Sequence, residues 1–144
     1  MWRTEHSIET TLSPEAIWEQ WADVASWPEW NGDIDRIELD GPFEAGSRIT
    51  MTPIGQDPIE LRIAEAAKPE LFIDEADLGE IVVRTIHRAE RLDTGRTRIS
   101  YRMQITGPGA STLGPEIGPE ISGDFPQVLG ALVARAAQSS KQSS

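Results

Sequence analysis

Two polar rings in the second half of the chain, His87 and Tyr101, are the side chains best suited to chemistry. Residues 96–105 alternate between apolar and polar side chains, which predicts a strand with Tyr101 on its core face. His87 belongs to the preceding predicted strand, residues 81–92. An imidazole can exchange a proton near neutral pH, and a phenol can hydrogen bond to a carbonyl. If the two rings face each other, they could orient a ligand or act on it.

The register of this hairpin decides whether the two rings meet. An even-length loop would turn charged side chains of the first strand toward the core, at a cost of several kcal/mol each. An odd-length loop, with Gly95 in the left-handed position of a bulged turn, avoids that cost. We therefore predict that His87 lies opposite Tyr101 and that Thr85 lies opposite Met103.

This register leaves space on the inner face, because Thr85 is small. A buried polar group without a hydrogen-bond partner costs about 1–3 kcal/mol. Two alternatives remain open: His87 and Tyr101 hydrogen bond to each other in a dry core, or they border a wet cavity. His6, on the inner face of the first strand, is expected to lie at the edge of the core.

The remaining elements must position these rings. Ser13 can cap a helix that begins at Pro14, and two short helices are expected before Asn31. A long amphipathic helix is expected from Ile121 onward, with Pro126 at a kink or in its first regular turn. Short turns separate seven predicted strands: residues 4–12, 34–40, 47–53, 59–63, 71–77, 81–92 and 96–105. This order predicts an α+β fold with one antiparallel sheet.

Two stretches are harder to interpret. Residues 71–77 carry several acidic side chains and no basic one, which indicates an exposed, charge-protected strand or bulge, or else a metal site without a nearby histidine. Residues 107–119 are rich in glycine and proline, which predicts a linker or a mobile flap and not a phosphate-binding loop.

Composition narrows the class of protein. The 144 residues fit one domain, predicted as residues 1–138 with a polar C-terminal tail at residues 139–144. A net charge of −11 disfavours nucleic acid and anionic membranes as partners. There are no cysteines and only two histidines, so we expect no metal and no cofactor. No apolar run reaches membrane-spanning length, so we expect no membrane insertion. We also expect a cytoplasmic protein that is a monomer or homodimer.

The ordered motifs resemble the START-like (SRPBCC) superfamily, in its polyketide cyclase/dehydrase-like branch. They comprise the first strand leading into residues 12–18, Trp27-Pro28-Glu29-Trp30, residues 41–46, residues 92–98 and the long terminal helix. The resemblance implies a helix-grip fold, in which a seven-stranded antiparallel sheet wraps around the C-terminal helix and two small helices close one end. It also implies a deep, mainly apolar pocket between sheet and helix.

The resemblance, together with the residue patterns, implies three candidate functions. The first is binding of a small apolar molecule such as a lipid or polyketide. The second is a polyketide cyclase or dehydratase with His87 as acid or base and Tyr101 polarising a carbonyl. The third is a protein-interaction module, related to co-chaperones, that would use an outward arginine stripe on strands 81–92 and 96–105. The residues predicted to contact a ligand are Trp30, Met51, Thr85, His87, Tyr101, Met103, Phe125 and Leu129.

Overall fold

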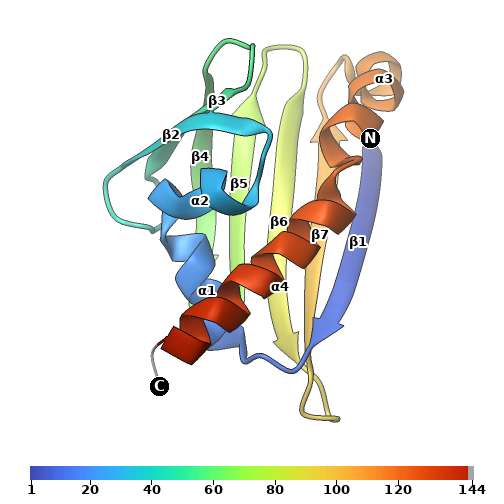
Figure 1. Cartoon of the computed structure of the whole chain (residues 1–144). Helices are drawn as coiled ribbons and strands as arrows, with labels where there is room; N and C mark the ends of the chain where they lie inside the picture. Colours follow the sequence, from blue (N-terminus) through green and yellow to red (C-terminus); the bar gives the residue numbers. More distant parts are fainter. Residues whose placement is uncertain (143–144) are drawn as a thin grey trace.

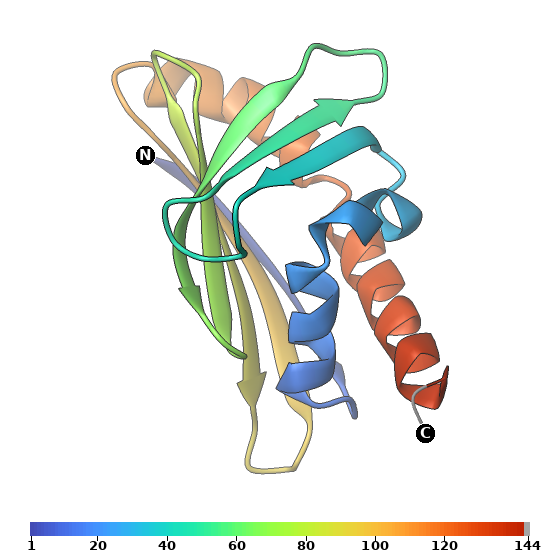
Figure 2. The same ribbon diagram turned by 90° about the vertical axis from the view of Figure 1, so that its left-hand side faces the viewer.

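The computed structural model describes residues 1–142, with side chains up to Ser139, and shows one curved antiparallel sheet that grips a long helix (Figures 1 and 2). The strand order is β1-β7-β6-β5-β4-β3-β2. The α+β prediction and the helix-grip architecture are confirmed. The strands are β1 (Trp2–Thr10), β2 (Ile34–Asp40), β3 (Arg48–Pro53), β4 (Ile59–Ala67), β5 (Leu71–Asp77), β6 (Val82–Arg91) and β7 (Thr97–Thr106).

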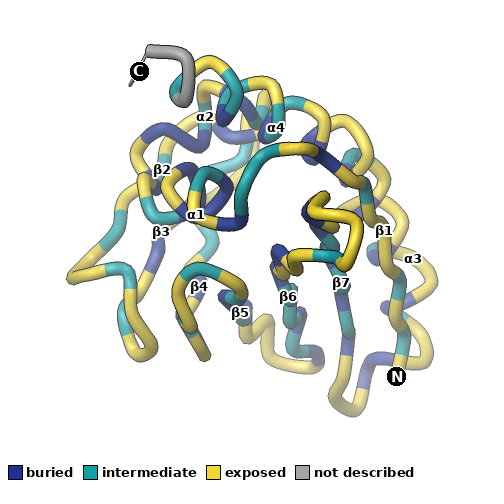
Figure 3. Tube along the Cα trace, turned by 90° about the horizontal axis from the view of Figure 1, so that it is seen from below, coloured by how far each residue is buried: buried dark blue, intermediate teal, exposed yellow. Residues whose placement is uncertain are grey.

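Two short helices carry the chain from β1, at one edge of the sheet, to β2 at the other. The α1 helix (Pro14–Ala22) begins as predicted, since the Ser13 hydroxyl accepts a hydrogen bond from the Ala16 amide at 3.2 Å. A 3-10 turn (Val24–Ser26) leads into α2 (Trp27–Trp30). The four tryptophans of this segment are buried, and Figure 3 shows buried positions on α1, on the strands and on α4.

The α4 helix (Phe125–Gln142) lies diagonally across the concave face of the sheet (Figure 1). Pro126 sits in its first turn, where a missing amide donor costs little. Leu129 and Leu132 are completely buried in the core. The helix extends through residues 139–142, which were predicted as the start of a polar tail, and the Gln20 amide donates to the Ser139 hydroxyl at 3.2 Å. The last two residues of that predicted tail, 143–144, lie outside the described residues.

Residues 110–122 form a helix, α3 (Ala110–Ser122), so the prediction of a linker or flap over residues 107–119 is wrong. The tetrapeptide Gly-Pro-Glu-Ile occurs twice in succession, and the repeat places Gly114 and Gly118 on one helix face against Trp2. A Cβ atom at either glycine would lie within 2.6 Å of the Trp2 side chain. Both prolines of the repeat are exposed, where the carbonyls that they leave unpaired can face water. Tertiary packing therefore stabilises a helix that local propensity disfavours.

The β6–β7 hairpin has the predicted register. Gly95 has a φ of +84°, and the Leu92 amide donates to the Arg96 carbonyl at 2.7 Å. His87 consequently pairs with Tyr101, and Thr85 pairs with Met103. Both side-chain pairs are on the concave face of the sheet, toward α4.

The outward arginines of this hairpin take part in ion pairs across the convex face. Arg84 contacts Glu75 at 3.2 Å, and Arg102 lies 3.8 Å from Glu5. Arg98 lies 3.9 Å from Glu9. These exposed pairs contribute little to stability individually, but they account for most of the predicted basic stripe.

Candidate ligand cavity

A cavity of about 500 Å³ lies between the concave face of the sheet and the helical layer. Six of the eight predicted ligand contacts line it: Trp30, Met51, Thr85, His87, Tyr101 and Phe125. The other two, Met103 and Leu129, are absent from the cavity wall because both are completely buried in the packed core.

Several of the aromatic rings that line the cavity contact one another. The His87 ring is parallel to the Phe72 ring, with centroids 3.8 Å apart and planes inclined by 6°. Trp21 meets Phe72 edge-on at 5.2 Å, and Phe125 meets Tyr101 perpendicularly at 5.6 Å. Such contacts fix ring orientations more tightly than apolar burial alone.

His87 is held in one tautomer by its backbone partner. Its Nδ1 atom lies 3.2 Å from the Phe72 carbonyl oxygen, which can only accept a hydrogen bond, so Nδ1 carries the proton. Burial lowers the pKa of His87 to about 3, and the hydrogen bond to Phe72 opposes this shift. The neutral ring therefore keeps an unprotonated Nε2 at neutral pH. His6, in contrast, pairs with Tyr101 on the edge strand β1 but is exposed.

The Tyr101 hydroxyl accepts a hydrogen bond from a partner distant in sequence. Trp21 Nε1 donates to it at 3.1 Å in the buried interior. Burial is the main reason that the pKa of Tyr101 is raised. His87 and Tyr101 therefore do not pair with each other as in the dry-core alternative: each has another partner, and both line the cavity.

Asp74 is a cavity residue that the sequence analysis missed. It lies two positions from Phe72 on the same face of β5, is 7% exposed, and lines the cavity. No hydrogen bond or ion pair to its carboxyl occurs among the described residues. Burial and, to a smaller extent, the adjacent Glu75 carboxylate together raise the pKa of Asp74 to about 7. Asp74 shares its face with Phe72 and Ala76, but Ile73 on the opposite face is buried as well, so the sequence pattern did not single out Asp74.

The expectation of an exposed acidic strand at residues 71–77 is therefore wrong for Asp74. Glu75 points to the convex face instead, where it forms ion pairs with Arg62 at 2.9 Å and with Arg84 at 3.2 Å. The metal alternative finds no support either, since residues 1–142 contain no group of three or more potential metal-ligating side chains.

Further acidic groups line the cavity where the helical layer meets the loops: Asp33, Glu120 and Asp124. Partial burial raises the pKa of Asp124 to about 7, and a hydrogen bond with the Asp33 carboxyl and its charge contribute as well. No lysine or arginine is among the described residues that line the cavity. Its polar groups are thus acidic or neutral.

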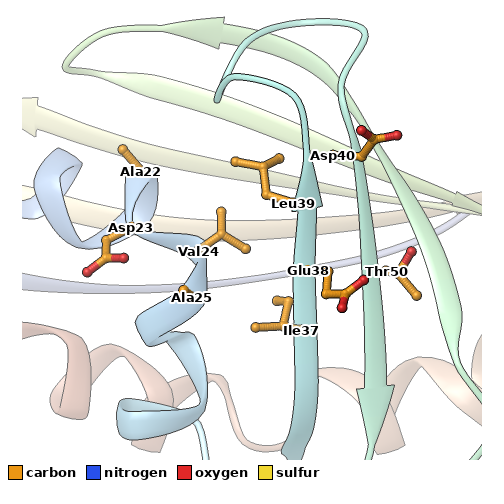
Figure 4. A pocket seen from close by; sticks show the side chains of 9 residues that line it. All are labelled: Ala22, Asp23, Val24, Ala25, Ile37, Glu38, Leu39, Asp40 and Thr50. Atoms are coloured by element: carbon orange, nitrogen blue, oxygen red, sulfur yellow. The ribbon is translucent and has the colours of Figure 1, made fainter.

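A second hollow, of about 720 Å³, lies between the α1–α2 segment and β2 (Figure 4). Ile37 and Leu39 lie on the side of β2 toward Val24, whereas Glu38 lies on the opposite side. Val24 is the one buried residue among those that line it, and none of the predicted ligand contacts takes part. We therefore assign the candidate site to the interior cavity.

The family described as polyketide cyclase/dehydrase and lipid transport matches residues 1–137. The chain belongs to this family. A comparison with curated proteins finds no match. No helix among residues 1–142 is both long and apolar enough to cross a membrane.

Several solved structures share this family member's fold at low sequence identity. A START superfamily protein from Mycobacterium smegmatis has a TM-score of 0.72 and 15% identity, covering 94% of this chain and 97% of its own. Norcoclaurine synthase from Thalictrum flavum, solved with dopamine and hydroxybenzaldehyde, has a TM-score of 0.74 and 12% identity; the match covers 94% of this chain and 86% of the synthase chain. A hypothetical protein from Helicobacter pylori has a TM-score of 0.74 and 16% identity; the match covers 93% of this chain and 87% of the other. These similarities establish the fold alone.

Proposed function

We propose that this protein binds a small, mostly apolar molecule in the cavity between the sheet and α4. The observation that carries the proposal is a cavity of about 500 Å³ between the sheet and the helices, walled mainly by aromatic and aliphatic side chains. Pockets of about 300–1,000 Å³ with this composition are typical of small-molecule sites.

Family and fold support the same function. The family description includes lipid transport, and norcoclaurine synthase holds two small aromatic compounds on the same fold. Phe72 and His87 both line the cavity, so an aromatic ligand would contact aromatic side chains there.

Tryptophan fluorescence provides the test, because Trp21, Trp27 and Trp30 line the cavity. Titration with apolar probes should change their emission with saturation, and native mass spectrometry without detergent should detect any ligand that is retained. Ala76→Leu, which adds volume to the cavity wall, should weaken binding. Ala45→Leu adds the same volume at an exposed turn and should leave binding unchanged. If no compound of a broad lipid and polyketide panel gave a saturable change in fluorescence, the proposal would be refuted.

A second candidate is a cyclase or dehydratase that acts on a poly-β-keto chain. One observation favours it: the cavity contains a carboxyl, Asp74, whose pKa is raised to about 7, where a general base is most effective. The pKa of His87, lowered to about 3, suits that role less well. We therefore expect Asp74→Asn to abolish turnover of a poly-β-keto thioester. Loss of turnover in His87→Ala, with Asp74→Asn active, would restore the role predicted from sequence.

A further inference from the structure

We propose that the ligand carries a protonated amine on an apolar body, and that the Asp74 carboxylate is the counter-ion of this amine inside the cavity. This inference rests on the proposed function and names the chemistry of the ligand.

The first argument is the isolation of the Asp74 carboxyl. It is 7% exposed and faces the cavity, and no described side chain or backbone group donates a hydrogen bond to it. Buried carboxylates in proteins are normally paired with a cation or with several donors. The cavity wall has no lysine or arginine, and His87 is neutral, so a cation that pairs with the ionised Asp74 carboxylate has to come from the ligand.

The second argument is the hydrogen-bonding character of the wall. His87 donates through Nδ1 to Phe72, which leaves Nε2 as an acceptor. Asp74 accepts when it is ionised, and the Thr85 hydroxyl, opposite Asp74 on β6, can accept as well. The wall also contains a buried donor without a partner, Trp30 Nε1. The acceptors of Asp74, Thr85 and His87 are complementary to a ligand group that carries several donors, as an ammonium does.

The third argument is electrostatic. Asp33, Glu120 and Asp124 also line the cavity, and the whole chain carries a net charge of −11. A concave surface with one sign of charge concentrates ligands of the opposite sign. The same field disfavours fatty acids and other carboxylates, which a cavity with a basic residue would accept.

The test compares three ligands that share one ring system and differ in charge: 2-(1-naphthyl)ethylamine, 2-(1-naphthyl)ethanol and 1-naphthylacetate. Isothermal titration calorimetry at about pH 8, above the pKa of Asp74, should rank the amine first and the carboxylate last. Asp74→Asn should weaken binding of the amine by roughly tenfold or more and leave binding of the alcohol nearly unchanged. Asp93→Asn removes one exposed carboxylate from the β6–β7 turn and should behave like the unmodified protein.

A second measurement does not depend on how the Asp74 variant folds. In the unmodified protein, amine affinity should fall as pH decreases through about 7, because Asp74 gains a proton. The other titratable groups that line the cavity are His87, Tyr101, Asp33, Glu120 and Asp124. Asp124 has a pKa raised into the same range, so Asp124→Asn must retain the pH dependence if Asp74 is responsible.

The outcomes separate the two proposals. Equal affinity for amine and alcohol, or an amine affinity that Asp74→Asn does not change, would refute the ammonium site and leave ligand binding intact. Failure of all three compounds to bind would count against the proposed function as well.

Discussion

The opposite pKa shifts of Asp74 and His87 predict a specific dependence of folding stability on pH. His87 is neutral in the folded protein down to about pH 3, but the unfolded chain binds a proton below about 6.5. Unfolding therefore takes up a proton in this range, and stability rises with pH. Asp74 stays protonated in the folded protein up to about pH 7, but ionises in the unfolded chain above 3.8, so its contribution falls with pH.

These two contributions nearly cancel between pH 3.8 and 6.5. In this range Asp74 is protonated only in the folded protein, whereas His87 is protonated only in the unfolded chain. Each has a slope of about 1.4 kcal/mol per pH unit, or about 3–4 kcal/mol over the window. That is a large part of the roughly 5–15 kcal/mol that stabilises a typical domain. Substituting Asp74 or His87 should therefore reveal the pH dependence of stability that the other residue contributes.

Asp74→Asn should therefore gain stability relative to the unmodified protein as pH rises from about 4 to 7, by about 1.4 kcal/mol per unit. His87→Phe, which keeps a flat ring against Phe72, should show the opposite slope up to about 6.5. Urea denaturation across this pH range measures both, and the comparison with the unmodified protein cancels all other titrating groups. A constant offset from the new side chain does not affect the slope.

Asp93→Asn is the control, because it removes an exposed carboxylate far from the cavity. A difference between Asp74→Asn and the unmodified protein that does not vary with pH would refute the assignment of Asp74 as a buried carboxyl with a raised pKa.

Two further predictions concern the packing of α3 and a buried hydrogen bond. Gly118→Ala should destabilise the protein by about 1–3 kcal/mol in urea denaturation, since its Cβ would lie 2.5 Å from the Trp2 ring. Gly130→Ala, where the helix surface is open, should instead stabilise it by about 0.5–1 kcal/mol, and equal effects would contradict the packing of α3 on Trp2. Tyr101→Phe should cost about 1–3 kcal/mol, because Trp21 Nε1 loses its buried acceptor. In a double-mutant cycle, Trp21→Phe should cost less in the Tyr101→Phe background than in the unmodified protein, although the smaller ring costs packing energy in both. Full additivity would argue against the hydrogen bond.

Local sequence patterns determined most of the fold. Alternation of apolar and polar residues located the strands, Ser13 marked the start of α1, and Gly95 set the register that places His87 opposite Tyr101. Each of these signals acts over a few residues, so it can be recognised without knowledge of the rest of the chain. The ordered motifs, together with these elements, then resembled the START-like superfamily.

Tertiary structure alone decided the chemistry of the cavity. In β5 both faces carry buried apolar residues, since Ile73 is buried on the side opposite Phe72, and alternation could not show which way Asp74 points. The partner of Tyr101 is Trp21, which lies 80 residues away in the chain. The α3 helix forms over glycines and prolines because Trp2 packs on it. These features depend on contacts between distant segments, whose energy no local pattern records.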